Sequence, residues 1–543
     1  MYAVIAGFGI RCGLKYWQYG RRNSPFKIIY RESGIFIAKI VVMMKTRRKY
    51  ILFIIAALIT LTTGVDIAAL NGPAYAAEPV VVADPLNSMD ANETALFTLI
   101  NAARQNPLET AVSLGLDREQ VLNDLPDLKD MLEKGLPPLV FNDRLYQAAG
   151  DHTREMLANS YYSYESLDGR TVDQRLQDAG YAPVKSSESL GLIVFKNFIN
   201  ADRAVYQLFE KMFKDELSPA WTGPRNILNP ELSEIGIGIA GGLYQSDALK
   251  GNVYLSTCDF GKSIEIYELQ LVQLINQFRA QPANVAASLG LDVEAITGVF
   301  PELKPVFLNG LPPVQFNVPL YLSAGEKIND MLENDYFGYA SPGGITLGQR
   351  IWAAGYRAEW AAETLARTAT CDIAMSPGLT VSRIFKQMCF NSLRTSGYRD
   401  ANLLSEKAVD AGFRMVAAES AAMGNICGDH VHVTVGDFGA GLIKAEPVVN
   451  GMVFVDENGN DLYDIGEEVS GVPVTIRAQG VNGASRTVVT NPAGGYGVSV
   501  APGLYRVSIG EAEGLQFKWI RVEAANVWQV FKVVADPVGG AGQ

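Results

Sequence analysis

Two stretches decide the fold: INAARQNPLETAVSLGLD at 100–117 and INQFRAQPANVAASLGLD at 275–292 align without a gap. The register holds at an offset of 175 residues, where GLPPLVFN (135–142) meets GLPPVQFN (310–317). Self-similarity over such a length is the signature of an internal repeat. The sequence therefore predicts a duplicated domain, and both copies close on the tripeptide DFG.

Each copy is expected to mix helices with a small antiparallel sheet. In the first copy, apolar residues recur at helical intervals in three segments: 95–104, 143–160 and 204–217. Asp143 is the expected N-cap of the second helix. Residues 233–242 and 252–261 alternate like the strands of a hairpin. The predicted fold class is α+β, with two three-layer α/β/α sandwiches.

The chain end changes character at about residue 447, where strand-like alternation replaces helical spacing. A small all-β sandwich is expected there, resembling the calcium-binding B-repeat domains of bacterial surface adhesins. The predicted boundaries are 1–42 for an upstream over-extension, 43–76 for a signal peptide, 89–262 and 263–442 for the copies, and 447–536 for the β-sandwich.

The composition excludes two classes of partner. The 543 residues carry a formal net charge of −12. Nucleic acids and anionic membrane surfaces require clustered Lys and Arg. The one dense basic run, KTRRK at 45–49, directly precedes the apolar stretch 51–65.

That arrangement, followed by small residues at Ala74 and Ala76, is typical of a secretory signal peptide cleaved after Ala76. An uncleaved membrane anchor is the alternative, although the apolar stretch is short for a span of about 20 residues. Translation starting at Met43 or Met44 would explain the segment upstream. The protein is expected to be secreted, periplasmic or on the cell surface, with membrane contact only through an uncleaved signal segment.

An exported chain meets an oxidising compartment, so the four cysteines after the signal could pair: Cys258, Cys371, Cys389 and Cys427. Cys371 with Cys389 is the preferred pair. Free buried thiols remain the alternative.

Each copy carries an ordered set of motifs that resembles the CAP superfamily (cysteine-rich secretory proteins, antigen five, pathogenesis-related proteins) in its bacterial SCP-like branch. In the first copy the set comprises Leu145, Ala148 and Ala149, His152, Met156, GRTVDQR (169–175), Gly-Tyr (180–181), Glu188, RNILNP (225–230), IGIG (235–238) and DFG (259–261). The resemblance covers nearly all of 93–262 and 268–440.

The resemblance implies a central cavity in which two histidines and acidic residues can hold a metal ion. Here the first histidine position, in the aromatic turns YYSYESLDG (161–169) and YFGYASPGG (336–344), is Tyr164 and Tyr339. The second position is Pro224 and Tyr398, each followed by an arginine, Arg225 and Arg399. The family's glutamate persists as Glu188 and Glu363.

A neutral phenol is a poor ligand for zinc, and a proline side chain has no atom that can coordinate a metal ion. We therefore expect no zinc and no catalytic residue in these cavities. A tyrosine there is structural or contacts a ligand by hydrogen bonding or stacking.

DENGNDLYDIGE at 456–467 has the spacing of a calcium loop. The candidate ligands are Asp456, Asn458, Asn460, the carbonyl of Leu462, Asp464 and Glu467. Asp461 stands where glycine is expected, which requires it to adopt the left-handed conformation. A calcium ion that stiffens this domain is expected, and a solvated acidic turn is the alternative.

His430 and His432 share one face of an expected strand, where an exposed strand edge is favoured over half of a metal site. No serine or cysteine arrangement typical of a nucleophile occurs. The leading hypothesis is an exported, non-catalytic binding protein for a lipid, a glycan or another cell-envelope component. The alternatives are a secreted hydrolase that uses Glu188 and Glu363, and a structural spacer.

Overall fold

The computed structural model describes residues 26–28, 38–46, 49–57, 89–196, 199–370, 377–394, 401–420, 430–480, 483–510 and 516–533. The chain divides into two compact units, Met1–Val81 and Val82–Gln543. Each unit is described by itself.

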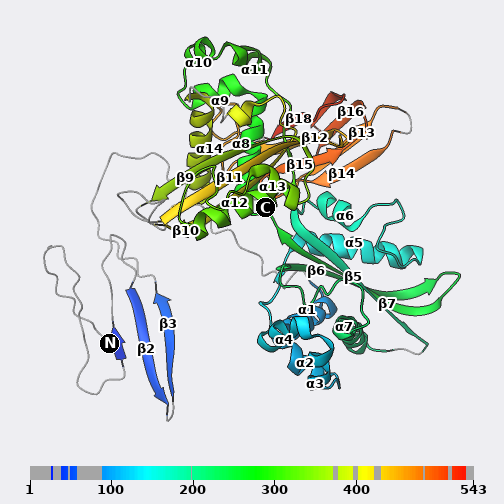
Figure 1. Cartoon of the computed structure of the whole chain (residues 1–543). Helices are drawn as coiled ribbons and strands as arrows, with labels where there is room; N and C mark the ends of the chain where they lie inside the picture. Colours follow the sequence, from blue (N-terminus) through cyan, green and yellow to red (C-terminus); the bar gives the residue numbers. More distant parts are fainter. Residues whose placement is uncertain are drawn as a thin grey trace, which may run out of the picture. The chain divides into compact units, whose positions relative to one another are not determined.

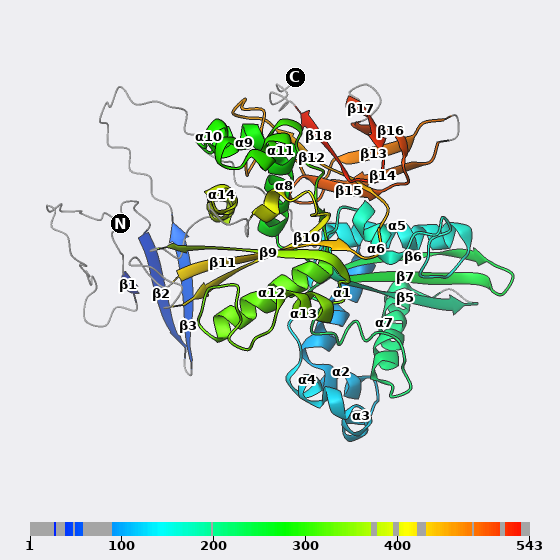
Figure 2. The same cartoon turned by 45° about the horizontal axis from the view of Figure 1, so that its top comes forward.

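The first unit contains a three-stranded antiparallel sheet of β1 (Phe26–Ile28), β2 (Ala38–Thr46) and β3 (Lys49–Ala57), in that order. Figure 1 labels β2 and β3, and Figure 2 labels all three strands. Residues 43–46 and 49–57 of the predicted signal peptide belong to β2 and β3. The rest of that segment, including the predicted cleavage position, lies outside the described residues.

The second unit begins with a sheet in the order β4-β6-β7-β5, of which Figure 2 labels β6, β7 and β5. Its strands are β4 (Val140–Phe141), β5 (Pro183–Phe195), β6 (Glu234–Gln245) and β7 (Lys250–Ser263). The surrounding helices are α1 (Ala91–Gln105), α2 (Pro107–Ser113), α3 (Arg118–Asp124), the 3₁₀ turn η2 (Pro126–Leu128), α4 (Lys129–Lys134), α5 (Asp143–Asn159), α6 (Val172–Asp178) and α7 (Ala201–Leu217).

Helices cover both faces of this sheet. Successive residues of a strand point to opposite faces, so residues of the same strand pack against different helices. Phe260 packs with α1 and α7 on one face, whereas Leu255 packs with Met156 of α5 on the other. The predicted helices and hairpin strands are present. The predicted N-cap of α5 is wrong by one residue: the Asn142 side chain accepts the backbone N–H groups of Arg144 and Leu145, and Asp143 is the first helical residue.

The following segment repeats the same sheet order, as β8-β10-β11-β9. Its strands are β8 (Gln315–Phe316), β9 (Ala358–Thr370), β10 (Asp410–Glu419) and β11 (His430–Gly441). Its helices are α8 (Ile266–Ala280), α9 (Pro282–Ser288), α10 (Val293–Val299), η3 (Pro301–Leu303), α11 (Lys304–Asn309), α12 (Val318–Glu333), α13 (Leu347–Ala353), α14 (Pro377–Arg394) and η4 (Ala401–Leu404).

One buried arginine at the end of the first long helix of each segment supports the loops. Arg104 donates to the carbonyl groups of Pro137 (3.0 Å), Ile227 (2.7 Å), Asn229 (3.0 Å) and Leu232 (3.1 Å). Arg279 does the same in the second segment, with Pro312 (2.8 Å), Leu403 (2.8 Å), Ser405 (3.0 Å) and Ala408 (3.1 Å). Burial lowers the pKa of both guanidinium groups to about 10, so both keep their charge at neutral pH.

The C-terminal segment forms two sheets, β15-β12-β18 and β14-β13-β16-β17. Its strands are β12 (Val448–Val455), β13 (Pro473–Ala478), β14 (Ser485–Val489), β15 (Gly495–Ser499), β16 (Gly503–Ile509), β17 (Gln516–Val522) and β18 (Val527–Val533). Val449 and Val453 of the first sheet share one core with Val474, Ile476 and Val507 of the second.

Several polar contacts join this segment to the helical parts of the unit, among them those of Gln277 and Arg486. Gln277 of α8 donates to the carbonyl of Tyr463 (3.0 Å) and accepts its backbone N–H (2.6 Å). Arg486 of β14 binds Asp178 at 2.7 Å. Leu462 and Tyr463 belong to the same buried core as Phe278 of α8.

Within the described ranges, no helix combines the length and the apolar composition needed to cross a membrane.

Candidate functional site

The aromatic turns are anchored through their backbone. The Tyr164 carbonyl accepts a hydrogen bond from Nη1 of Arg175 (2.9 Å), and the Tyr339 carbonyl accepts one from Nζ of Lys327 (3.0 Å). The two tyrosines are 50% and 46% exposed, so each side chain lies largely at the surface. Burial of the hydroxyl and the nearby charge of Glu188 raise the pKa of Tyr164. Its phenol therefore stays neutral at physiological pH.

Both glutamates lie beneath these turns and are bound by arginine. Arg175 Nη2 and Glu188 Oε1 are 2.7 Å apart, with side chains 5% and 0% exposed. Arg350 binds Glu363 in the same way, with both side chains 6% exposed. A buried carboxylate needs such a partner, because an isolated charge in the interior is costly.

A second buried carboxyl group lies across the sheet from each glutamate. The antiparallel register pairs Glu188 with Asp259, and Glu363 with Asp437. Residues directly opposite in such a pair have Cβ atoms about 5 Å apart. Burial, and then the Glu188 charge, raise the pKa of Asp259. The equivalent effects raise the pKa of Asp437 to about 7.

Asp259 has no hydrogen-bond donor of its own. Neither of its oxygens meets a donor among the described residues, and the second Glu188 oxygen, Oε2, also lacks one. Two facing carboxyl groups can hydrogen-bond only when one carries a proton. In the other segment, Asp437 accepts the Ser323 hydroxyl at 2.6 Å. The sequence reasoning missed both aspartates, although their repetition in DFG was the signal that marked them.

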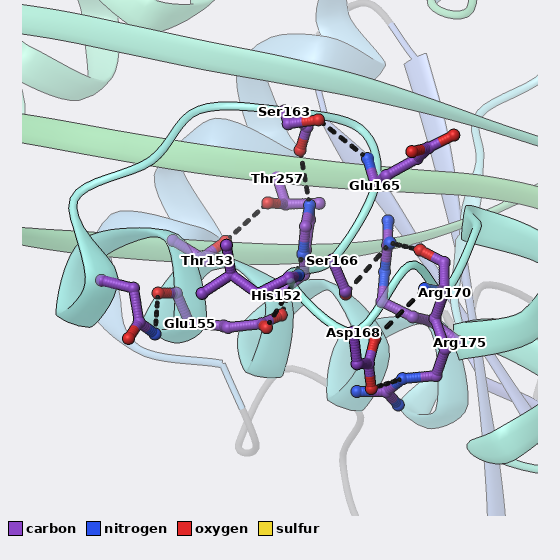
Figure 3. Close-up of polar contacts among 12 residues, drawn as sticks. His152, Thr153, Glu155, Ser163, Glu165, Ser166, Asp168, Arg170, Arg175 and Thr257 are labelled. Atoms are coloured by element: carbon purple, nitrogen blue, oxygen red, sulfur yellow. Dashed lines mark hydrogen bonds and ion pairs between the residues drawn. The ribbon is translucent and has the colours of Figure 1, made fainter.

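The segments differ in the group beside these acids. His152 of α5 is buried, with Nε2 3.0 Å from the Ser163 carbonyl and Nδ1 3.6 Å from Glu155 (Figure 3). Burial lowers its pKa, so the ring is neutral at pH 7. Lys327 takes its place in the second segment, fully buried, and donates to the Tyr336 hydroxyl at 2.8 Å.

The predicted second histidine position follows α7 in the chain. Pro224 is exposed, and Arg225 donates to the carbonyl groups of Glu216 (2.7 Å) and Ser218 (3.1 Å) at the end of α7. The next residue contacts strand β5, because Asn226 Nδ2 donates to the backbone carbonyl of Glu188 at 3.1 Å. Tyr398 and Arg399 lie outside the described residues.

Comparisons with known proteins found one matching family model. The sequence model of the cysteine-rich secretory protein family, CAP, matches residues 97–260. Residues 97–260 form a CAP domain. A search of curated proteins found no match.

Two solved structures are similar to the chain. An outer surface protein from Borrelia burgdorferi is 16% identical over 27% of this chain and 90% of that one, with a TM-score of 0.18. An extracellular protein with an SCP domain from Bacillus anthracis is 16% identical over 37% of this chain and 56% of that one, also with a TM-score of 0.18.

Several polar groups of the CAP domain are held by other residues of the domain. Across the described ranges, no three His, Cys, Asp or Glu side chains lie close enough to share a metal ion. Glu188 is committed to Arg175, and His152 to the Ser163 carbonyl. The arrangement therefore buries an arginine–glutamate ion pair opposite a second carboxyl group.

The acidic loop between β12 and β13 brings its predicted ligands together. The amide groups of Asn458 and Asn460 both donate to Oδ2 of Asp464, at 2.8 and 2.7 Å. Both Glu467 oxygens accept backbone N–H groups of the loop. Asp461 has φ = 64°, the left-handed conformation that this position requires.

A lysine occupies the open side of this loop. Lys532 of β18 binds Asp456 at 3.2 Å and also contacts Asp461. The oxygen donors fit a hard cation in number and type. Binding would require the two asparagine amides to turn and the ammonium group to move away.

Two further expectations need correction. Strand β11, which carries His430 and His432, is not an edge strand, because β10 and β9 pair with it on either side. Cys258 and Cys389 are free buried thiols, so the preferred disulfide is not formed. Cys371 and Cys427 lie outside the described residues.

Proposed function

We propose that the chain is an exported, non-catalytic binding protein with two CAP-like domains and a C-terminal β-sandwich. The second CAP-like domain is supported by the repeated sheet order and by the equivalent carbonyl contacts of Arg104 and Arg279. In this proposal each CAP-like domain is a three-layer α/β/α sandwich, and the β-sandwich spans about 447–536.

The observation that carries this proposal is the burial of each glutamate against an arginine. The Glu188 side chain is 0% exposed and that of Glu363 is 6% exposed. A general base must reach the proton that it abstracts, within about 3 Å or through one water. Carboxylates held in buried ion pairs are better suited to fixing the turn above them.

The turns offer the binding surface. Tyr162 and Tyr164 are 43% and 50% exposed, and Tyr339 is 46% exposed. An exposed phenol can stack against a sugar ring or an acyl chain and still hydrogen-bond through its hydroxyl. The ligand class is therefore a lipid, a glycan or another component of the cell envelope.

The acidic loop completes the proposal as a calcium site. An ion bound by Asp456, Asp464 and Glu467, together with the amide oxygens of Asn458 and Asn460, would stiffen the β-sandwich rather than take part in chemistry.

Native mass spectrometry of protein purified from its own envelope or medium, with and without chelator, tests these points together. The proposal expects bound calcium that the chelator removes and a co-purifying lipid or glycan. Turnover of envelope polymers by the wild-type protein, lost in Glu188→Gln, would reject the non-catalytic reading.

A secreted hydrolase is the second candidate, favoured by the two acid pairs. An ionised glutamate beside a protonated aspartate is the combination used for acid–base hydrolysis. The two candidates separate in a single assay, because a hydrolase releases product from cell-wall or polysaccharide substrates and a binding protein only retains them.

A further inference from the structure

The outer face of the sheet β14-β13-β16-β17 is basic and aromatic. Val474, Ile476 and Val507 point into the core, so the residues between them point outward. Cross-strand pairing then aligns Arg477 with Arg506, and Arg506 with Trp519. We call the set Arg477, Arg506, Phe517, Trp519 and Arg521 the basic face.

The two central arginines repel each other without compensation. Like charges directly opposite in a sheet are destabilising. Arg477, Arg506 and Arg521 form no ion pair with any described residue. The four strands contain five Lys or Arg residues and no Asp or Glu, in a chain of net charge −12. Of the five, Arg486 alone is neutralised, by Asp178.

The Arg506 side chain is held by an aromatic ring, and one of its N–H groups has no hydrogen-bond partner in the described part of the chain. Its guanidinium carbon lies 4.3 Å from the centroid of the Phe517 ring, which holds it over the sheet. Its Nε is buried and has no hydrogen-bond partner among the described residues. A buried donor without a partner costs free energy that a bound anion would recover.

Two aromatic rings flank these charges on the edge strand. Phe517 and Trp519 are 48% and 53% exposed. They stand two residues apart on β17, about 7 Å along the strand. A hollow of about 530 Å³ is lined by Leu504 and Arg521, with Glu523 as its acidic member. Because Glu523 lies near Arg521, the positive charge of the basic face is concentrated at the paired residues Arg477 and Arg506.

We infer that the basic face binds an acidic polysaccharide. The arginines supply bidentate contacts to carboxylate groups, and the exposed rings supply stacking surfaces for the sugars between them. Charge complementarity selects an anionic polymer, and the row of aligned side chains across the paired strands suits an extended chain. This assigns a ligand to the C-terminal segment in addition to the stiffening role proposed above.

The test uses the purified full chain and polygalacturonate, with the fully methyl-esterified polymer as the uncharged probe. We expect calorimetric binding of the acid form that weakens as sodium chloride is added, and little binding of the ester. Arg477→Gln and Trp519→Ala should each weaken binding by about tenfold or more.

Lys518→Gln is the matched control, because it removes one exposed charge from the same strand without touching the basic face. It should change affinity by less than about twofold. Arg477→Gln should also leave the thermal midpoint unchanged or raised, because it relieves the repulsion with Arg506. That combination separates lost binding from lost folding.

Three results would overturn the inference. Equal losses in Lys518→Gln and Arg477→Gln would indicate non-specific charge attraction. Binding to phosphatidylglycerol vesicles but not to polygalacturonate would identify a membrane surface instead. Unchanged affinity in Trp519→Ala would remove the stacking role that distinguishes sugars from other anions.

Discussion

Asp259 lies directly opposite Glu188 on neighbouring strands, and Arg175 binds the glutamate alone. Asp437 and Glu363 repeat this relationship with Arg350. In each segment the arginine contacts only the glutamate, and burial raises the pKa of the second acid, so its neutral form is favoured there.

Replacing Asp437 should change how stability depends on pH. A carboxyl pKa of about 7 in the folded state, against 3.8 ordinarily, favours folding below pH 4. That contribution is lost as the pH rises from about 4 to 7. Between about pH 4 and 7, the unfolding free energy measured by urea denaturation should fall in both proteins. The fall should be smaller in Asp437→Asn than in wild type, by up to about 4 kcal/mol.

Two controls accompany this prediction. The exposed Asp247→Asn should leave the wild-type slope unchanged. Glu216, whose pKa burial also raises to about 7, should leave a residual slope in both proteins. A wild-type protein equally stable at pH 4 and pH 8 would contradict the prediction.

Lys327 should set the titration of the aspartate near it. Its positive charge is one of the influences that lower the pKa of Asp437 against the effect of burial. Lys327→Met should therefore move the Asp437 midpoint above about 7 in a carbon-13 NMR titration. In the first segment His152 stands in the place of this lysine, and burial and the Glu188 charge raise the pKa of Asp259. An unchanged midpoint in the variant would show that the lysine does not act on Asp437.

Arg279→Leu should be among the most destabilising substitutions in the chain. It leaves four carbonyl groups without their donor, and the expected loss is about 3–5 kcal/mol of unfolding free energy. Arg118→Gln, which removes an exposed ion pair with Glu109, should cost less than about 1 kcal/mol. Chemical denaturation measures both, and similar losses would deny Arg279 its supporting role.

Lys532 should compete with calcium for the acidic loop. Lys532→Met removes an ammonium group that lies 3.2 Å from Asp456, so calcium should bind more tightly than in wild type by calorimetric titration. Asp456→Asn should weaken binding, because it removes a charged ligand. If calcium titration releases no heat with wild type, Lys532→Met or Asp456→Asn, the solvated acidic turn is favoured over the calcium site.

Gln277→Ala should loosen the contact between α8 and the acidic loop. It leaves the buried N–H and carbonyl of Tyr463 without partners, at an expected cost of about 1–3 kcal/mol. Hydrogen exchange should then quicken at Tyr463 itself, while the amides of β5 and β7 keep their protection. Uniform acceleration across the chain would instead indicate global destabilisation.

The local features were predictable from the sequence because they depend on neighbouring residues. Helical spacing indicated α5 and α7, and strand alternation indicated β6 and β7. The N-cap assignment was wrong because Asn142 and Asp143 are both good caps, and the pattern cannot rank adjacent candidates.

The partners within the site could not be predicted in this way. Glu188 meets Asp259 only through the register of β5 on β7, which the folded sheet determines. Arg104 reaches carbonyl groups more than 120 residues away. The position of His430 and His432 on a central strand likewise depends on which strands flank β11.

The core of the middle segment also contains Met452, Phe454, Leu462 and Tyr463, which lie well after α8 in the chain. During synthesis from the N-terminus, those residues emerge after every helix of that segment. The core residues of the segment around α1 to α7 are all synthesised early. The middle segment cannot cover its apolar surface until the last part of the chain has been synthesised. The order of maturation therefore differs between two halves that otherwise share one topology.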